Sequence, residues 1–304
     1  MTKIIVGVDR TERSRDAVAL AAELARTAGT EVILANTYSY DGVPSHAAGP
    51  EFDRRLRAEA TETLQRAASG LAGIVPELRA LPGSTAAREL HALAEHECAA
   101  LVVIGSSHRG DVGRVFAGTT AERLLHGSPC PVAVAPNGFA EREGREVKRI
   151  VVAHDGGREA KAALEAAMSA ARSLSAAVRV VRVLGPSRVS GVGAEAWPAY
   201  PIPADQIELE AREQFEADIA ALPEGDAVEA VFVVGDPVEE LASQSEAADL
   251  VVTGSRGYGP LRAVLLGGVS GRLVRAAACP VIVIPRGVGS HFEQLFADAG
   301  SVVS

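Results

Sequence analysis

The chain lacks the features that mark several large classes of protein. None of its apolar stretches approaches the roughly 20 uninterrupted residues that a membrane-spanning helix requires. It also has no excess of basic residues, because its formal net charge at pH 7 is −9. Binding to phosphate backbones or acidic membranes needs a basic face. We therefore expect neither a membrane protein nor a partner of nucleic acids.

Cysteine is equally scarce. The three cysteines, Cys98, Cys130 and Cys279, are too few and too scattered for a disulfide framework, and no CxxC pair suggests zinc. Cys130 and Cys279 each precede a proline and an apolar strand, which predicts buried structural thiols. The N-terminal residues already have the pattern of a strand, without the elements of a signal peptide. We therefore expect a cytoplasmic protein.

The motifs of the common enzyme classes are missing as well. There is no GxxxxGK loop followed by Ser or Thr, no GxGxxG, no HExxH and no GxSxG. The typical residues of P-loop nucleotide hydrolases, dehydrogenases, metalloproteases and serine hydrolases are thus absent. Without a P-loop lysine or an evident general base aimed at a γ-phosphate, we do not expect rapid ATP hydrolysis. We predict no catalytic residue and no metal site held by the protein.

What the chain contains instead is an internal repeat. The strand pattern that ends at Asp9 recurs 146 residues later and ends at Asp155. The glycine-rich stretch that begins at Gly105 recurs 149 residues later at Gly254. Such spacing indicates one unit of about 140 residues written twice. The polar, glycine-bearing stretch 137–146 is typical of an exposed linker between the two copies.

The repeat predicts three parts: a domain over residues 1–140, a second over 147–286, and a C-terminal tail over 287–304 without a counterpart in the first unit. Each unit alternates short apolar strands with helices, which is typical of a parallel sheet covered on both faces. The predicted fold class is α/β, with two tandem, doubly wound, five-stranded parallel sheets. The strands are expected at 4–8, 31–36, 78–81, 101–104 and 131–135, and at 150–153, 178–183, 231–234, 250–253 and 281–284.

Two helix starts and one strand pairing can also be predicted. Ser84 is placed to cap a helix over 85–97, and Asp236 to cap a helix with Pro237 at its first position. The last strand of each unit is apolar and expected at a sheet edge, and proteins usually cover such edges. Pairing the two edges within one chain would create an internal pseudo-dimer. Whether chains then form a homodimer is left open.

Both halves carry a pattern that suits the binding of phosphate. An apolar strand runs into glycines, at 105–110 and at 254–259, and a helix start follows. Glycine lets backbone N–H groups approach an anion closely, and a helix N-terminus favours negative charge. In open α/β sheets the ligand lies beyond the carboxyl ends of the strands. Asp9 and Asp155 are expected at such ends.

Three motifs recur, with some departures: a strand ending in Asp, the spacing Gly-x-x-Gly-x9-Gly followed by Ser or Thr, and Cys-Pro-Val-x-Val-x-Pro at 130–136 and 279–285. Through them the chain, over residues 1–286, resembles a tandem universal stress protein of the ATP-binding subgroup. The resemblance implies a Rossmann-like fold similar to the adenine nucleotide alpha hydrolases. It also implies ATP, carried as its Mg²⁺ complex, with the two aspartates contacting adenosine and the glycine loops and later hydroxyls holding phosphates.

The candidate ligand-binding residues are Asp9, Gly105, Gly118 and Thr119 in the first half, and Asp155, Gly254, Gly257, Gly267, Gly268 and Ser270 in the second. Neither half matches the family pattern fully. The first has His108 at the second glycine position, and the second has Gly268 where a hydroxyl residue is expected. The alternative is that the aspartates only cap the helices that follow and that the glycines only form turns. Four further residues are placed to neutralise phosphates: Arg109, Arg114, Arg256 and Arg262.

Three hypotheses of function remain open. The first is an ATP-binding stress-response or regulatory module with slow or no hydrolysis, in which the nucleotide biases a surface offered to an unknown protein partner. The second is an interaction protein of the same fold that binds no nucleotide, which His108 and Gly268 would favour. The third is a slow ATPase or phosphotransferase, whose phosphate release would be lost on Asp155→Ala.

Overall fold

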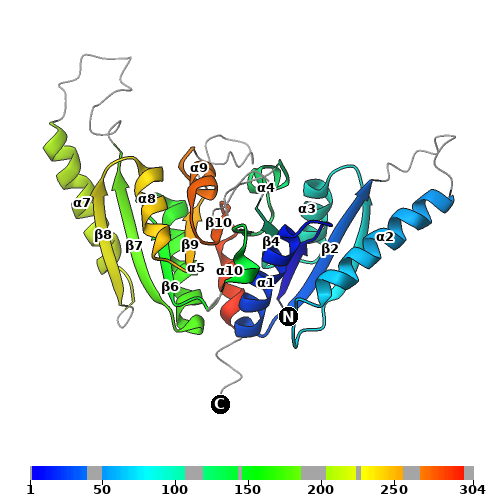
Figure 1. Cartoon of the computed structure of the whole chain (residues 1–304). Coiled ribbons are helices and arrows are strands. Elements are labelled where there is room, and N and C mark those ends of the chain that lie inside the picture. The colour runs from blue at the N-terminus through cyan, green and yellow to red at the C-terminus, as the bar shows by residue number, and fades with distance from the viewer. Residues whose placement is uncertain are drawn as a thin grey trace, which may run out of the picture.

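The computed structural model describes residues 2–39, 50–106, 119–142, 146–185, 203–223, 227–255 and 268–297. Strands and helices alternate in both halves, as the sequence predicts (Figure 1). The first half consists of β1 (Lys3–Gly7), α1 (Arg13–Ala28), β2 (Glu31–Ser39), α2 (Pro50–Ala68), β3 (Glu77–Gly83), α3 (Ala86–His96), β4 (Leu101–Gly105), α4 (Thr119–Leu125), β5 (Val132–Ala135) and the 3-10 turn η1 (Phe139–Glu141). The second consists of β6 (Arg149–Ala153), α5 (Arg158–Leu174), β7 (Ala177–Leu184), α7 (Ala204–Ala220), β8 (Val228–Val234), α8 (Pro237–Glu246), β9 (Leu250–Gly254), α9 (Gly268–Ala276), β10 (Val281–Ile284) and α10 (Gly289–Ala297).

The strands form a single ten-stranded sheet in the order β3-β2-β1-β4-β5-β10-β9-β6-β7-β8. Neighbouring strands within each half run parallel. In contrast, β5 and β10 pair antiparallel, with Val134 opposite Val281 and Val132 opposite Val283. The predicted pairing of the two last strands is confirmed. The chain is therefore an internal pseudo-dimer in which two parallel sheets are joined edge to edge.

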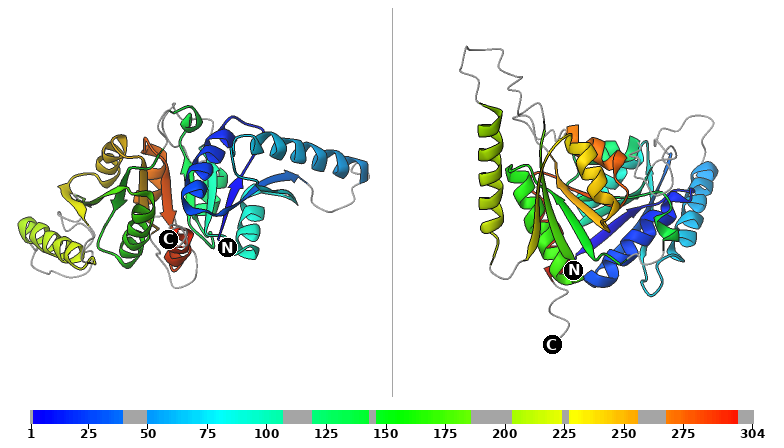
Figure 2. Two further views of the ribbon diagram at one scale, coloured as in Figure 1. Left: turned by 90° about the horizontal axis from the view of Figure 1, so that it is seen from below. Right: turned by 60° about the vertical axis from the view of Figure 1, so that its left-hand side comes forward.

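One hydrophobic core lies on each face of the sheet, and both cores contain residues of both halves. Helices α1, α2, α5, α7 and α10 contribute to one core, and α3, α4, α8 and α9 to the other. Figure 2 shows helices on both sides of the sheet. Ile4 and Ile5 belong to different cores because successive strand residues point to opposite faces. Helices on both faces of parallel strands confirm the doubly wound α/β class.

The central helices α1 and α5 are rich in alanine, which has the highest intrinsic helix propensity and lets a helix approach the sheet closely. Both helices end at a residue in the left-handed conformation: Gly29 has a φ of 62° and Ser175 a φ of 52°. The cap N–H of Gly29 donates to the carbonyl of Ala25, which satisfies one of the last helical acceptors. None of the helices in the described ranges is both long and apolar enough to cross a membrane.

The prediction that two of the cysteines are buried is confirmed. Cys130 and Cys279 are buried, and burial raises the pKa of each thiol to about 12. Both thiols therefore remain protonated at neutral pH and behave as small apolar groups. Cys98 is exposed at the end of α3 and has a φ of 49°.

Of the two predicted helix starts, one is confirmed and one is wrong. Asp236 Oδ1 accepts hydrogen bonds from the N–H groups of Val238 at 2.8 Å and Glu239 at 3.2 Å, and so caps α8. Ser84 does not cap α3, because Thr85 holds the N-cap position, without a side-chain hydrogen bond. Strand β3 remains paired with β2 as far as Gly83, and the helix starts correspondingly later.

The connection between the halves is held by a buried carboxylate. Asp16 of α1 accepts hydrogen bonds from the N–H groups of Gly138 at 3.0 Å and Ala140 at 2.8 Å, at the start of η1. Burial raises the pKa of Asp16, although the two hydrogen bonds act in the opposite direction. Helix α1 thus fixes the chain where it leaves the first half.

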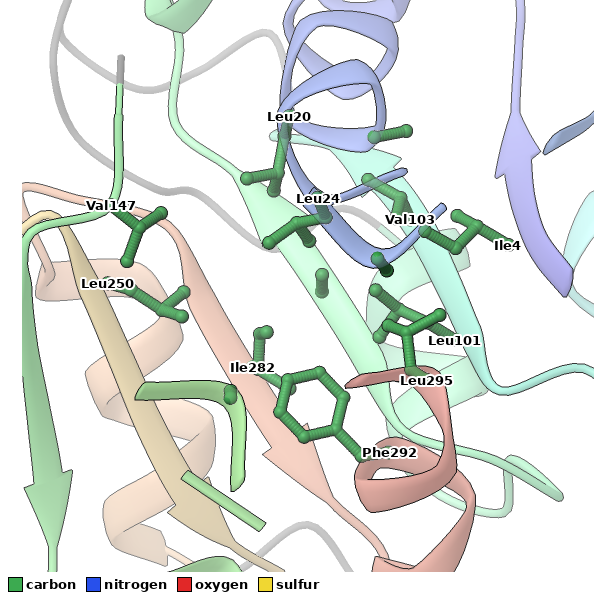
Figure 3. Close-up of a cluster of buried hydrophobic side chains, with 14 of the residues drawn as sticks. Ile4, Leu20, Leu24, Leu101, Val103, Val147, Leu250, Ile282, Phe292 and Leu295 are labelled. Carbon is green, nitrogen blue, oxygen red and sulfur yellow. The ribbon is translucent and has the colours of Figure 1, made fainter. Parts of the chain in front are cut away.

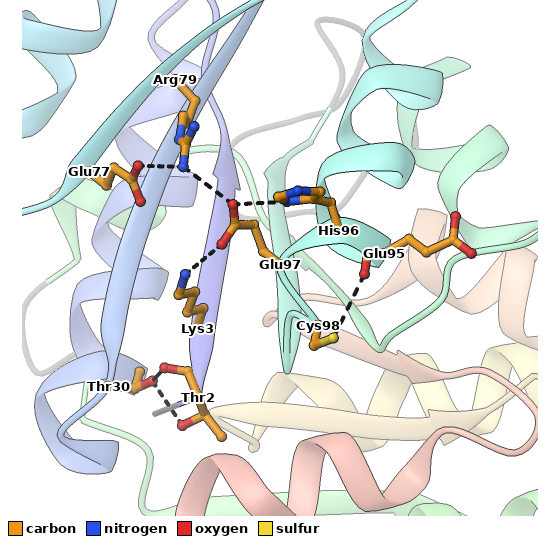
Figure 4. Close-up of polar contacts among 9 residues, drawn as sticks. All are labelled: Thr2, Lys3, Thr30, Glu77, Arg79, Glu95, His96, Glu97 and Cys98. Atoms are coloured by element: carbon orange, nitrogen blue, oxygen red, sulfur yellow. Dashed lines mark hydrogen bonds and ion pairs between the residues drawn. The ribbon is translucent and has the colours of Figure 1, made fainter.

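An ion network joins the first residues of β1 and β3 to the residues at the end of α3 (Figure 4). The carboxylate of Glu97 is 8% exposed and lies 2.5 Å from Lys3 Nζ, 3.3 Å from Arg79 Nη2 and 3.3 Å from His96 Nδ1. Because Arg79 is only half-buried and His96 is exposed, the pairs that these two side chains form with Glu97 contribute little to stability. The network positions the turn after α3 rather than forming a ligand site.

The C-terminal tail, whose conformation the sequence left open, begins with a repeated turn and continues as a helix. Gly138 and Gly287 follow the last strand of their halves at equivalent positions, with φ values of 77° and 79°. This left-handed conformation favours glycine. After the second turn the chain forms α10, which packs against α5.

Helix α10 is part of the core on its face of the sheet. Phe292 and Leu295 are 0% exposed, and Phe296 is 2% exposed. Figure 3 shows Phe292 and Leu295 in one cluster with Ile282 of β10 and Leu101 of β4. The helix therefore covers the region where the two halves of the sheet meet.

Replacing Phe292 by alanine is expected to lower the free energy of unfolding by about 3–5 kcal/mol, because a buried phenyl group is lost and a cavity remains. Chemical denaturation followed by circular dichroism measures the change. Gln294→Ala, on the exposed side of the same helix, is the matched control and should shift stability by less than about 0.5 kcal/mol. Equal effects of the two substitutions would contradict the assignment of α10 to the core.

Candidate functional site

The strand order creates one topological switch point in each half. β1 lies between β2 and β4, and β6 lies between β7 and β9. At such a point the helices that follow the central strand and its neighbour pack on opposite faces, which opens a crevice beyond the carboxyl ends of the strands. The structure brings Asp9 and Gly105 together at the first switch point, and Asp155 and Gly254 at the second.

The second switch point contains a cavity of about 250 Å³. Apolar side chains of β7 and α8 contribute to its lining, and so do polar residues at the ends of β6 and β9 and in α9. An apolar lining with a few polar groups is typical of small-molecule sites. The lining residues include Asp155, Val181, Val183, Gly254, Ser255 and Ser270.

Gly254 and Gly105 have a packing role that does not depend on a ligand. A Cβ at Gly254 would lie 2.6 Å from the carbonyl oxygen of Glu159, and a Cβ at Gly105 would lie 2.4 Å from that of Arg13. Both carbonyls belong to the first turn of the helix that follows the central strand. Glycine therefore lets the strand end and the helix start approach each other closely.

Two hydroxyl groups of the cavity differ in their bonding. Ser270 Oγ donates a hydrogen bond to the carbonyl oxygen of Gly254 at 2.8 Å and so joins the start of α9 to the end of β9. Ser255 is fully buried, and its hydroxyl has no hydrogen-bond partner in the described part of the chain. A buried polar group without a partner costs about 1–3 kcal/mol. A ligand that bonds to this hydroxyl would remove the cost.

The two aspartates shape the turns that lead into the helices. Asp155 Oδ1 accepts a hydrogen bond from the N–H of Gly157 at 2.9 Å. Asp9 Oδ1 accepts hydrogen bonds from the Thr11 N–H at 2.9 Å and from the Ser14 hydroxyl at 2.9 Å. Neither aspartate holds the N-cap position, which belongs to Glu12 in α1 and to Gly157 in α5. The alternative that the aspartates cap these helices is therefore wrong, although both carboxylates stabilise the turn that precedes the helix.

These bonds affect the ionisation of the first aspartate. Burial alone would raise the pKa of Asp9, but the hydrogen bonds from Thr11 and Ser14 and the nearby Arg13 guanidinium outweigh it and lower the pKa. The carboxylate of Asp9 is therefore charged at neutral pH and already engaged by its own chain.

A buried polar cluster lies beside the second aspartate. The N–H of Gly156 donates to His154 Nδ1 at 3.2 Å, so the neutral imidazole carries its proton on Nε2. Nε2 faces Asp218 Oδ2 of α7 at 3.6 Å, and Asp218 Oδ1 lies 2.7 Å from Lys161 Nζ of α5. Arg182 of β7 is buried nearby. Burial lowers the pKa of His154, which the attraction of Asp218 only partly offsets.

Several predicted residues lie outside the described residues. These are Gly118, Gly257 and Gly267, together with His108, Arg109, Arg114, Arg256 and Arg262. Thr119 is the first described residue of α4. Gly268 is the first described residue of α9, and no other described residue lies within 4 Å of a Cβ built on it.

Sequence reasoning missed Ser255 and the apolar residues of β7. The repeat itself held a signal for the serine, because Ser106 and Ser255 follow the glycine at the same place in both halves. Val181 and Val183 gave no such signal, since apolar residues in a strand are expected in the core. Only the strand register shows that they end beside the cavity.

Comparison with known proteins decides the family. The model of the universal stress protein family matches residues 1–136 and 146–285. The chain belongs to the universal stress protein family. The predicted tandem arrangement is thereby confirmed.

Individual relatives agree with this assignment. A universal stress protein of Mycobacterium tuberculosis is 32% identical over 187 residues, which is 61% of this chain and 61% of that relative's length. A universal stress protein structure from Archaeoglobus fulgidus is 19% identical, covers 94% of this chain and 98% of that one, and superposes with a TM-score of 0.69, which shows a shared fold. Another protein of that archaeon, crystallised in complex with dAMP, is 26% identical, covers 44% of this chain and 98% of its own, and has a TM-score of 0.35.

The packing role of Gly254 predicts a loss of stability without any ligand. Gly254→Ala is expected to lower the free energy of unfolding by about 1–3 kcal/mol, because the added Cβ would meet backbone atoms of Glu159. Thermal and chemical denaturation measure the effect. Gly268→Ala is the control: its Cβ meets open space, and alanine is favoured over glycine within a helix by up to about 1 kcal/mol. Wild-type stability of the Gly254 variant would disprove the packing role.

The buried imidazole predicts a pH dependence of this universal stress protein. Because burial holds the pKa of His154 below 6.5, the unfolded chain binds a proton more readily than the folded chain. The stability due to neutral His154 is complete above pH 6.5 and is lost as the pH falls below that value. Asp218, Lys161, Arg182 and Asp155 are the charged groups that act on the imidazole.

His154→Gln should therefore weaken the dependence of the free energy of unfolding on pH below neutrality. Chemical denaturation at a series of pH values, from neutral to mildly acidic, measures the slope. His126→Gln removes an exposed histidine after α4 and is the control. An unchanged slope in the His154 variant would show that this imidazole does not govern the acid sensitivity.

Proposed function

We propose that this universal stress protein binds ATP, as its Mg²⁺ complex, in the cavity of its second half and acts as a nucleotide-dependent stress-response or regulatory module. The cavity carries the proposal: it lies at the switch point beyond β6 and β9, and it is lined by Asp155 and by Ser255, whose hydroxyl lacks a partner in the described ranges. A buried hydroxyl in this state suits a site that is completed by a ligand.

The cavity fits the nucleoside part of the ligand. Its volume of about 250 Å³ is slightly below the roughly 300–1,000 Å³ of typical small-molecule sites. Val181 and Val183 offer apolar contacts for an adenine ring, and Asp155 offers a hydrogen-bond acceptor for a ribose hydroxyl. The phosphates would extend out of the cavity toward α9.

The start of α9 suits the phosphates. No described residue lies within 4 Å of a Cβ built on Gly268, so this position can accommodate a neighbouring group, and a helix N-terminus favours negative charge. Among the described residues, the cavity lining includes no lysine or arginine, whereas Asp155 and Glu159 are acidic. Mg²⁺ that arrives with the nucleotide would offset this charge, since it is commonly held by substrate phosphates. The described residues contain no group of three potential metal ligands.

The same geometry supports slow hydrolysis or none. A general base must reach the attacking water near the γ-phosphate. The imidazole of His154 faces Asp218 of α7 instead, and Asp155 is engaged by Gly157 at the nucleoside end. The nucleotide would therefore act as a signal that biases the conformation of the chain, provided that the conformations differ in affinity.

Equilibrium dialysis of the purified chain with ATP and Mg²⁺ tests the proposal. Saturable binding is expected, and the absence of any bound ATP would overturn it. Phosphate release measured in the same samples should remain near the background rate. Steady release would favour a slow ATPase instead.

Ser255→Ala distinguishes a ligand contact from a structural role. Loss of one hydrogen bond, worth about 0.5–1.5 kcal/mol, should weaken ATP binding about 2–10-fold. The free energy of unfolding without ATP should stay equal or rise, because the hydroxyl has no partner among the described residues. Ser270→Ala is the contrast, since it loses the bond to Gly254 and should lower stability. Unchanged ATP affinity of the Ser255 variant would remove this hydroxyl from the site.

A further inference from the structure

The two switch points differ at one position of the helix that follows the central strand. Asp9 and Asp155 are 146 residues apart, and the same spacing relates Arg13 to Glu159. Both residues lie in the first turn of their helix, and both supply the carbonyl that packs against the glycine at the end of β4 or β9. The backbones are thus equivalent, but one half carries a long cation where the other carries a carboxylate.

Arg13 lies across the first switch point. Its Nη1 donates a hydrogen bond to the carbonyl oxygen of Ser106 at 3.3 Å, and its Nη2 lies 3.8 Å from Asp9 Oδ2. The side chain is 19% exposed, so it is largely enclosed. The guanidinium therefore connects the end of β4 with the turn after β1.

The counterpart of Arg13 has a different partner in the second half. Asp155 and Ser255, the counterparts of Asp9 and Ser106, both line the open cavity. Glu159, the counterpart of Arg13, also lines the cavity, but its Oε1 pairs with Arg286 Nε at 3.4 Å, after the end of β10. The two halves also differ beside the aspartates. Ser14 donates a hydroxyl hydrogen bond to Asp9, whereas the equivalent residue in the second half is Ala160, which has no hydroxyl group.

We propose that Arg13 closes the first switch point by bridging Asp9 and the Ser106 carbonyl, so that each chain binds one adenine nucleotide, in its second half. The inference rests on the proposed function and determines its stoichiometry and location. Ligand entry in the first half requires the guanidinium to leave both of its contacts. In the second half the residue equivalent to Arg13 is Glu159, which pairs with Arg286 instead of bridging Asp155 and the Ser255 carbonyl.

The first test counts nucleotides. Equilibrium dialysis with ATP and Mg²⁺ is expected to give one bound ATP per unchanged chain and two per Arg13→Ala chain. Arg15→Ala removes an exposed arginine of the same helix, which pairs with Glu12, and should leave the count at one. Two ATP per unchanged chain would overturn this inference while the proposed function stands. No ATP on the unchanged chain would overturn both.

The reciprocal substitution tests the inference in the second half, without any change in the first. Glu159→Arg places the residue of the closed site in the open one and should abolish ATP binding. Glu165→Arg, which reverses an exposed charge on the same helix, should bind one ATP as before. Thermal unfolding without ATP shows whether each variant is folded. A folded Glu159→Arg chain that binds ATP normally, or an Arg13→Ala chain that still binds only one, would overturn the inference.

Discussion

The antiparallel pairing of β5 with β10 is the contact on which the rest of the structure depends. Each strand would otherwise leave an apolar edge with unpaired backbone groups, and pairing removes both edges at once. It also lets the cores on the two faces continue from one half into the other. The bond from Asp16 to the linker and the burial of α10 at the junction keep the two sheets in this arrangement.

Duplication within this frame produced two switch points with different side chains. Both halves keep a glycine where the strand end meets the carbonyl of the next helix, because any side chain would collide with backbone there. The shared glycine is therefore explained by the packing of the fold and does not by itself indicate a ligand. The differences lie in side chains: Arg13 against Glu159, Ser14 against Ala160, and an apolar Val8 against the buried, polar His154. A fold held constant by packing can therefore present different side chains at its two switch points.

Sequence reasoning was most successful where the determinants are local. The Asp236-Pro237 start of α8 was predicted correctly because a carboxylate cap and a proline at the first turn act within a few residues. The prediction that Ser84 caps α3 was wrong, because the pairing of β3 with β2 extends further along the chain than the local pattern suggests. Ser255 was missed because a serine after a glycine has no special character until its surroundings bury it.

The sequence by itself determined the repeat, the family, the α/β class and the pairing of the two last strands, because periodicity, recurring motifs and apolar edges are written in residue order. Only the tertiary structure decided that a side chain of the first turn bridges the walls of the first switch point while its counterpart in the second half pairs elsewhere. That outcome depends on where the Arg13 guanidinium and the Glu159 carboxylate find partners, Ser106 and Asp9 for one and Arg286 for the other. Such partners are distant in sequence and meet only when strands and helices are packed together.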